Sequence, residues 1–207
     1  MNIFKYTIRK NVKNPDTNIF GGLEINRMNK HHKELINWGL QFVDFENVKS
    51  ALDIGCGGGK CIKEISQKTA KDTKIYGIDI SKESIKKSTI ENKKDVENNR
   101  VSLLTGSAEK LPFIDIYFDL ITAVETIYFW NLELSFKEIY KALNKNGKFV
   151  IINELKIKEN AVELTKAFDV NVYQIDEIKT LATKIGFSDC KVIEKEDSEW
   201  FTLILTK

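Results

Sequence analysis

Short apolar runs alternate with stretches of helical periodicity along most of the chain, and this alternation constrains the fold more than any other feature. Five strands are expected first, at 50–54, 74–79, 101–105, 118–124 and 148–153. Two more are expected near 191–196 and 200–206, with only three residues between them. Alternation predicts a parallel sheet with helices on both faces, whereas so short a connection allows only an antiparallel hairpin. We therefore expect a mostly parallel, seven-stranded α/β sheet with an antiparallel terminal strand.

Helix boundaries are indicated by capping residues. Ser81 suits an N-cap before a helix rich in Lys and Glu. A stripe with 3.6-residue periodicity predicts a helix that begins near Leu132 and ends at Asn146–Gly147. A last amphipathic helix over 175–185 is expected to stop at Gly186, because glycine suits the position after a helix.

Length and composition indicate one domain with a small appendage. The 207 residues are 42% hydrophobic, which is enough for a single buried core. No apolar run approaches the roughly 18 residues of a membrane-spanning helix, and the first residues lack the apolar block of a signal peptide. The three cysteines are sparse and have no metal-ligand spacing. We expect a soluble cytoplasmic protein without a metal site or a membrane partner.

The charge balance argues against a nucleic-acid partner. The 32 basic and 30 acidic residues nearly cancel. The arginines are only Arg9, Arg27 and Arg100, whereas nucleic-acid binders usually concentrate arginine for contacts with phosphate and guanine. The oligomeric state is left open by the sequence.

Two irregular segments flank the alternating region. Residues 1–48 are expected to form a helical cap, with its helix over 29–43, before a main domain over 49–207. A second irregular stretch at 153–173 separates the fifth strand from the last helix. Ligands of open α/β sheets sit at the carboxyl ends of the strands. The cap and the 153–173 insertion are therefore the natural places for substrate selection.

The stretch from Asp53 to Lys60, D-I-G-C-G-G-G-K, lies where the first strand turns into a helix. Glycine at such a place permits positive φ and close approach of a ligand. A phosphate loop of the G-x-x-x-x-G-K-[ST] kind would need glycine at Ile54 and Ser or Thr at Cys61. The dinucleotide motif G-x-G-x-x-G would need glycine in place of Lys60. Neither motif fits.

What remains is an acidic residue followed by alternate glycines: Asp53, then Gly55, Gly57 and Gly59. This pattern resembles motif I of the class I S-adenosylmethionine-dependent methyltransferases, D-x-G-C-G-x-G. The resemblance implies a Rossmann-like fold and S-adenosylmethionine as the cofactor. It also implies that the loop, including Cys56, passes under the methionine and ribose of that cofactor.

Further stretches resemble the same family. Asp79 ends the second strand in Y-G-I-D-I-S, where the family uses a carboxylate to accept the ribose hydroxyls. The segment G-S-A-E-K-L-P-F at 106–113 resembles the adenine-facing G-D-A-x-x-L-P-F, with Ser107 in place of Asp, so that hydrogen bond is expected to be weaker or shifted. F-D-L-I and L-N-K-N-G-K resemble the family's F-D-x-V and L-K-P-G-G blocks. The cofactor-binding residues implied are Asp53, Gly55, Cys56, Gly57, Gly59, Asp79, Ile80, Ser107, Ala108, Glu109 and Glu125.

Candidate catalytic residues follow the fourth strand. The sulfonium methyl group is already activated, so the main task of the protein is in-line alignment, and a base is needed only for an acceptor whose proton must leave early. Glu125 is a candidate base beside the cofactor methionine, and Tyr128 a candidate contact. The faces of Tyr128, Phe129 and Trp130 could attract a sulfonium or a cationic acceptor, or simply pack under the next helix.

Two histidines begin the N-terminal helix. His31 lies one turn before Leu35, and His32 lies one turn before Ile36. Family members often lay such a helix across the cofactor pocket, where a histidine could act as a base near neutral pH. His31 is the third candidate catalytic residue, and a surface position is the alternative for either histidine.

The acceptor is expected to be a small molecule, methylated by in-line displacement. The chain lacks the Asn- or Asp-Pro-Pro-aromatic motif of methyltransferases that act on base amino groups. None of the cysteines is placed as the nucleophile of a cytosine C5 enzyme. The alternatives are a protein or RNA methyltransferase, or a non-catalytic accessory protein that binds S-adenosylmethionine.

Overall fold

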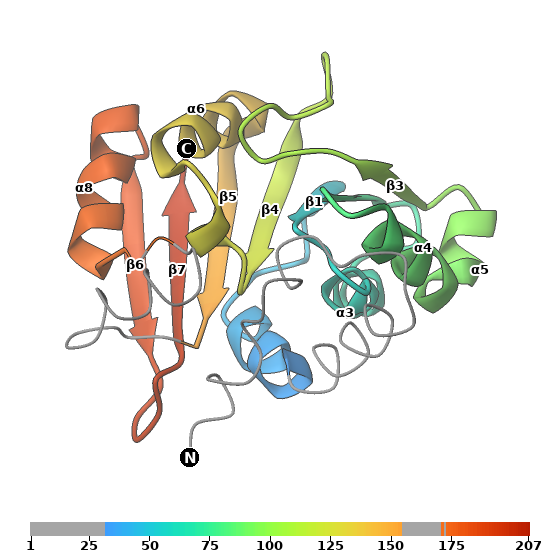
Figure 1. The fold of residues 1–207 in the computed structure, drawn as a ribbon, viewed down its shortest axis with the longest axis horizontal. Helices are drawn as coiled ribbons and strands as arrows, with labels where there is room; N and C mark the ends of the chain where they lie inside the picture. The colour runs from blue at the N-terminus through green and yellow to red at the C-terminus, as the bar shows by residue number, and fades with distance from the viewer. Residues whose placement is uncertain (1–31, 155–170, 172) are drawn as a thin grey trace.

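The computed structural model of the chain describes residues 32–154, 171 and 173–207 (Figure 1). One sheet of seven strands runs through it in the order β3-β2-β1-β4-β5-β7-β6. The strands are β1 Ser50–Ile54, β2 Lys74–Asp79, β3 Val101–Thr105, β4 Phe118–Val124, β5 Leu143–Asn153, β6 Asp189–Glu194 and β7 Phe201–Thr206. Neighbours among β1 to β5 pair in parallel, and β7 runs antiparallel to both β5 and β6. The predicted sheet is confirmed.

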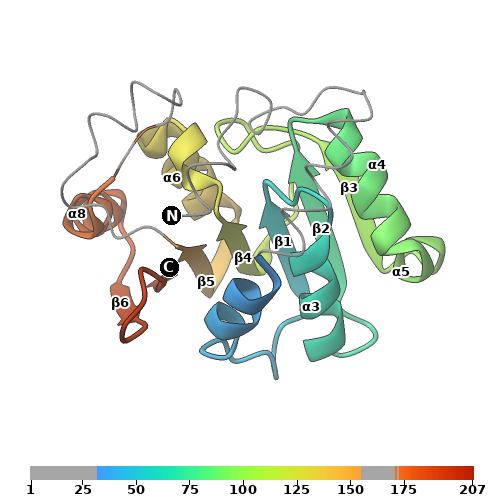
Figure 2. The ribbon, with the colours of Figure 1, turned by 60° about the horizontal axis from the view of Figure 1, so that its bottom comes forward.

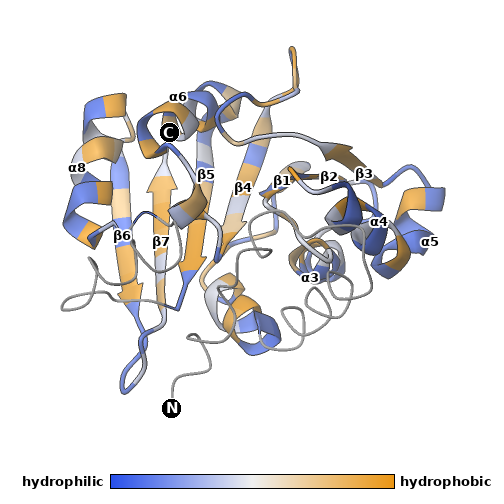
Figure 3. Cartoon of the chain, viewed as in Figure 1, coloured by the Kyte–Doolittle hydropathy of each residue, from blue (hydrophilic) through white to orange (hydrophobic). Residues whose placement is uncertain are grey.

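Helices cover both faces of this sheet (Figure 2). Besides an N-terminal helix at 32–40, they are α3 Lys60–Lys68, α4 Lys82–Glu91, α5 Lys93–Glu97, the 3₁₀ turn η1 Ile127–Phe129, α6 Leu132–Ala142 and α8 Ile175–Ile185. Successive residues of a strand point to opposite faces, so β5 serves two cores. Phe149 and Ile151 join the cluster under α6 and α8, whereas Val150 and Ile152 join the cluster under the helix at 32–40 and α3. The apolar strands lie between helices whose outer sides are polar (Figure 3).

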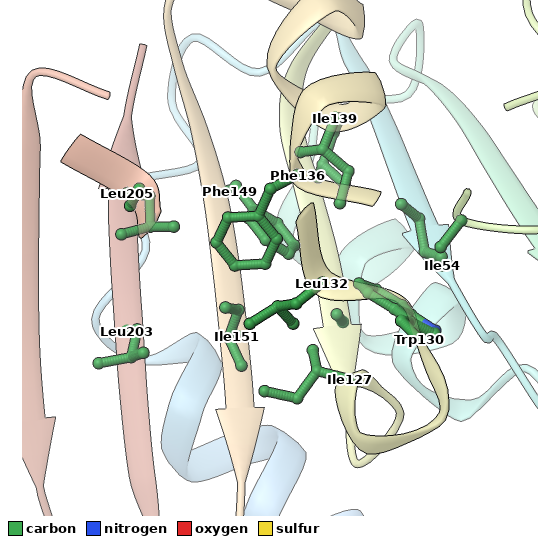
Figure 4. Packing of buried hydrophobic residues seen from close by; sticks show 14 of the residues in the cluster. Ile54, Ile127, Trp130, Leu132, Phe136, Ile139, Phe149, Ile151, Leu203 and Leu205 are labelled. Carbon is green, nitrogen blue, oxygen red and sulfur yellow. The ribbon is translucent and has the colours of Figure 1, made fainter. Parts of the chain in front are cut away.

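The first core is built around α6 (Figure 4). Leu132, Phe136 and Ile139 recur at helical spacing and are buried against the sheet. The ring of Phe136 meets that of Phe149 edge to face, with centroids 5.3 Å apart. Each such fully buried side chain contributes about 1.5–3 kcal/mol of burial free energy, so this face anchors the turn η1 that precedes α6.

The second core positions the N-terminal helix. Leu35, Ile36 and Leu40 are buried in it, as the predicted stripes require. Gly39 lies so close to β5 that a Cβ there would come within 2.6 Å of the Ile152 side chain. The helix therefore rests directly on the strand. Its described helical residues end at position 40, three earlier than predicted.

Two predicted helix boundaries are confirmed and one is wrong. Ser81 caps α4, its hydroxyl accepting from the Ser84 amide, and Gly186 ends α8 in the left-handed conformation at φ 119°. Asn146–Gly147, however, does not end α6. That helix stops at Ala142, and residues 144–147 are taken up by an irregularity where β5 pairs with β4. The Lys207 ammonium donates to the Leu143 carbonyl at 2.7 Å, so a residue distant in sequence satisfies the helix end.

None of the helices in the described part of the chain is long and apolar enough to cross a membrane.

Arg100, just before β3, joins the C-terminal end of α3 to α5. Its Nη1 donates to the Ser66 hydroxyl at 2.9 Å, and its Nη2 donates to the carbonyls of Ser66 and Ala70 at 2.8 and 2.9 Å. Nη2 also donates to the Thr69 hydroxyl at 3.0 Å, and Asp95 lies 3.6 Å from Nη1. A guanidinium fork can satisfy all these acceptors at once, whereas a lysine ammonium cannot.

We expect Arg100→Lys to lower the free energy of unfolding by about 1–3 kcal/mol, because partly buried acceptors lose their donor. Urea denaturation followed by circular dichroism measures the change. Lys93→Ala is the control, since it removes only an exposed ion pair with Glu97 at 3.7 Å and should change stability by less than about 0.5 kcal/mol. Equal stability of Arg100→Lys and the unsubstituted protein would contradict this role of Arg100.

Candidate active site

A cavity of about 330 Å³ lies at the carboxyl ends of the central strands. The strand order places β1 between β2 and β4, so the chain leaves the middle of the sheet in both directions. Such a switch point opens a crevice that suits a ligand. The predicted site residues that line the cavity are Asp53, Gly55, Cys56, Gly57, Asp79, Ile80, Ser107, Ala108, Glu109 and Glu125. The sheet therefore brings together residues that are up to 72 positions apart, from Asp53 to Glu125.

Hydrogen bonds tie the glycine loop to the end of β2. The amides of Gly55 and Cys56 both donate to the Ile78 carbonyl, at 2.8 and 2.9 Å. The Gly57 amide donates to Asp79 Oδ2 at 2.9 Å. The Ile78 carbonyl and the Asp79 carboxylate thus fix the loop through three hydrogen bonds from its amides.

Gly57 and Gly59 share the left-handed conformation but have different surroundings. Gly57 has φ 51° and nothing within 4 Å of the place where a Cβ would stand. Gly59, at φ 83°, would overlap Ser88 of α4 and Asn92, which follows that helix, if it carried a Cβ. Gly59 does not line the cavity and instead lets α3 pack against α4. Of the predicted loop glycines, Gly59 is therefore a packing residue.

Two aspartates are buried beside the loop. Asp53 is 2% exposed and accepts from the Thr122 hydroxyl at 2.7 Å, and burial raises the pKa of its carboxyl group to about 7. Asp79 is 9% exposed, and burial raises its pKa also, although hydrogen bonds from the amides of Ser81 and Gly57 oppose that effect. Both carboxyl groups are thus costly to ionise in the protein alone.

Glu125 is the third buried acid of the cavity, at the end of β4. Its backbone has φ 53°, an uncommon conformation for a residue with a side chain. Its amide donates to the Ile152 carbonyl at 3.0 Å and to Asn153 Oδ1 at 3.3 Å, while its Oε1 accepts from the Glu154 amide at 2.6 Å. Burial raises the pKa of this carboxyl group to about 7. The end of β5 therefore holds Glu125 in place.

Tyr128 is placed behind Glu125. It is 8% exposed and does not line the cavity. Its interaction with the Glu125 side chain lowers the pKa of Glu125 and opposes the effect of burial, while burial raises the pKa of the phenol itself. Tyr128 thus lies behind the cavity wall, whereas Phe129 and Trp130 line the cavity.

Of the two histidines, His32 lines the cavity together with Ile36, one helical turn later. The candidate His31 lies outside the described residues. Ile36 belongs to the core under the N-terminal helix, while Phe129 and Trp130 pack with the core under α6. The cavity is consequently walled from both faces of the sheet.

The residues that follow β2 and β3 form a separate wall of the cavity. The side chain of Ile80 is 43% exposed, and Ala108 is buried beneath the wall. The Ser107 hydroxyl accepts from the Glu109 amide at 3.2 Å, so this oxygen is already engaged. Glu109 Oε1 accepts from the Asn131 amide at 2.7 Å, which joins this wall to the start of α6.

Several lining residues were not predicted from the motifs. Lys60 and Cys61, at the start of α3, and Thr126, after β4, all line the cavity. The sequence signal for Thr126 is Gly55. A Cβ on Gly55 would overlap the Thr126 side chain, so glycine at this position indicates a close neighbour. Within the described residues, no group of three or more His, Cys, Asp and Glu side chains could hold a metal ion.

Comparisons with known proteins agree on one family. The family described as "Methyltransferase domain" matches residues 52–151. The "Uncharacterized methyltransferase YdaC" of Bacillus subtilis is 28% identical over 142 residues, which are 68% of this chain and 76% of that protein. A sterol 24-C-methyltransferase of Kluyveromyces lactis is 28% identical over 158 residues, and the match covers 70% of this chain but only 41% of the yeast protein.

The fold has close counterparts among solved structures. The crystal structure of a SAM-dependent methyltransferase from Aquifex aeolicus superposes with a TM-score of 0.73 at 18% identity, covering 88% of this chain and 96% of that one. Family, fold and the position of the glycine loop at the switch point agree. Residues 52–151 match the methyltransferase domain, the fold is that of S-adenosylmethionine-dependent methyltransferases, and both imply S-adenosylmethionine as the cofactor of this enzyme.

Proposed function

We propose that this enzyme transfers the methyl group of S-adenosylmethionine to a small-molecule acceptor by in-line displacement. The observation that carries the proposal is the cavity, whose volume of about 330 Å³ suits a small ligand. Its walls contain both the loop that would hold the cofactor and a carboxyl group able to take a proton. The related yeast protein is named for a sterol, which is also a small molecule.

The residues present fit the cofactor. The open space above Gly57 lets a ligand approach the loop backbone, which a side chain at that position would prevent. The Asp79 carboxylate retains lone pairs beyond its two backbone hydrogen bonds, and these would accept the ribose hydroxyls. Ile80, Ser107, Ala108 and Glu109 would border the adenine.

The remaining wall would hold the acceptor. His32, Ile36, Phe129 and Trp130 line the cavity but belong to none of the cofactor motifs. An aliphatic side chain and an imidazole thus lie on one side, and two aromatic rings come from the other core. Such a wall suits an acceptor with an apolar body, because it offers area for burial and few hydrogen bonds.

Glu125 would act as the general base. The cofactor supplies an activated methyl group, so the chain needs only to orient the acceptor and to receive its proton. A carboxyl group with a pKa of about 7 is well matched to proton transfer near neutral pH. The Glu154 amide and the Tyr128 hydroxyl would orient it. An acceptor hydroxyl or amine is therefore favoured over one that carries no proton.

The assignment of Asp79 is tested by Asp79→Asn. We expect its affinity for S-adenosylmethionine to fall about 10–100-fold, because hydrogen bonds to a charged group are worth about 1.5–3 kcal/mol and the amide cannot accept as many. Isothermal titration calorimetry measures the change. Asp72→Asn is the matched control, since Asp72 is 74% exposed and forms an ion pair with the exposed Lys49. Unchanged affinity in Asp79→Asn would remove this residue from the site.

The two loop glycines are expected to respond differently to alanine. Gly57→Ala should cost only about 1–2 kcal/mol of stability, the strain of the left-handed conformation, but lower cofactor affinity at least tenfold because its methyl group enters the cavity. Gly59→Ala should cost about 2–4 kcal/mol, because overpacking against α4 adds to the strain. Thermal unfolding and cofactor titration of both variants separate the two effects, and equal profiles would contradict the assignment.

Methyl transfer itself is tested by incubating the protein with S-adenosylmethionine and a panel of small hydroxyl and amine compounds, detecting S-adenosylhomocysteine. We expect turnover of at least one compound, and Glu125→Gln should slow it at least 100-fold by removing the base. Turnover of proteins or RNA alone would refute the small-molecule acceptor.

A further inference from the structure

We propose that the Glu125 carboxyl group senses the charge on the sulfur of the bound cofactor. It is ionised while the sulfur carries the methyl group, and it is protonated again once that group has left. Glu125 thereby sets the preference of the enzyme for S-adenosylmethionine over the product S-adenosylhomocysteine. The inference deepens the proposed function and rests on it for the transfer step, but the preference itself is a property of binding.

The geometry that carries this inference is a carboxyl group fixed inside the cavity. Glu125 lines the cavity yet is 9% exposed, so little water screens its charge. Three backbone or side-chain groups of β5 and its extension hold it: the Ile152 carbonyl, the Asn153 side chain and the Glu154 amide. The left-handed backbone at φ 53° is strained, and such strain is retained where the surrounding structure requires one orientation.

Burial of Glu125 makes its ionisation sensitive to the charge of a bound ligand. Because desolvation raises the pKa of Glu125 to about 7, small changes in nearby charge decide its state at neutral pH. A sulfonium in the same cavity favours the carboxylate and lowers this pKa. Each unit of lowering corresponds to a tenfold gain in affinity for the charged ligand over the neutral one.

Other titratable groups share the cavity or contact Glu125, from every neighbouring element. Asp53 lies at the end of β1, Asp79 at the end of β2, Lys60 in α3, Glu109 after β3, His32 in the N-terminal helix, Tyr128 in η1 and Glu154 after β5. Negative charge on Glu154 raises the pKa of Glu125, and Tyr128 stays neutral because burial raises the pKa of its phenol. Lys60 pairs with Glu91 at 3.1 Å. Asp53 and His32 are the groups that a test must separate from Glu125.

Methyl transfer changes the charge on the sulfur and the charge on Glu125 together. The acceptor–carbon bond forms while the carbon–sulfur bond breaks, and sulfur keeps the electron pair of the broken bond. The positive charge passes to the methylated acceptor, whose proton then moves to a carboxylate oxygen of Glu125. Sulfur and Glu125 end neutral, so the attraction that held the charged cofactor is absent from the product complex.

The experiment measures dissociation constants for S-adenosylmethionine and S-adenosylhomocysteine by calorimetry from pH 5.5 to 8.5. Both ligands carry the same amino and carboxylate groups, whose titration largely cancels in the ratio of the two constants. Between the lowered pKa of Glu125 in the complex and its value of about 7 in the free protein, binding of the charged ligand releases a proton. The preference for S-adenosylmethionine should therefore rise about tenfold or more up to pH 7 and level off above it.

Glu125→Gln should make the preference independent of pH and lower it at least tenfold at pH 8. The matched control is Glu109→Gln, which changes another carboxyl group of the cavity and should keep the rise. His32→Asn and Asp53→Asn should keep it also. Loss of the rise in either of these two, or its persistence in Glu125→Gln, would assign the effect to another group and overturn the proposal.

A second measurement needs no variant. Titrations at pH 6.5 in two buffers of different ionisation enthalpy should show about 0.5–0.8 more protons released with S-adenosylmethionine than with S-adenosylhomocysteine, because Glu125 with a pKa of about 7 is only partly protonated at that pH. Equal proton release with both ligands would overturn the inference, even if methyl transfer is observed. Conversely, a pH-dependent preference without turnover of any acceptor would leave the sensing intact and refute the proposed acceptor chemistry.

Discussion

Burial of three carboxyl groups around one cavity is the constraint on which the site depends. Asp53, Asp79 and Glu125 stand at the ends of three strands and are nearly excluded from water. Ionised carboxylates in such surroundings need partners, and each of these three receives at least one hydrogen bond from a neighbouring strand or loop. The order of the sheet therefore creates a cavity in which ionising the carboxyl groups costs free energy. A cationic ligand would stabilise their ionised form.

The same strands that bury these acids also orient them. Thr122 stands opposite Asp53 in the parallel pairing of β4 with β1, so the register of the sheet delivers the hydroxyl that bonds it. The end of β5 does the same for Glu125 through the Ile152 carbonyl and the Glu154 amide. Site geometry here follows from strand register more than from loop conformation, and a register is hard to shift without exposing a buried face.

The sequence predicted the elements that depend on residues close together in the chain. Alternating apolar runs and turn residues predicted the sheet, and the cap at Ser81 and the stop at Gly186 are confirmed because neither depends on distant residues. The end of α6 was not predicted correctly, because the distant Lys207 donates to the Leu143 carbonyl that follows this helix. In the site, motif spacing indicated the glycine loop and the residues at the ends of β2 and β3, but not the wall formed by Ile36, Lys60, Cys61 and Thr126. The left-handed backbone of Glu125 follows from contacts with β5, which sequence periodicity cannot reveal.

The close packing of Gly39 against Ile152 affects how the cavity of this enzyme can change in evolution. The helix that carries His32 and Ile36 is spaced from the sheet by Gly39, which does not line the cavity. Any larger residue at 39 would lift that helix and widen the cavity, and a smaller residue at 152 would let it settle again. The width of the cavity is thus adjustable by paired changes outside it, one in the helix and one on the strand that also holds Glu125.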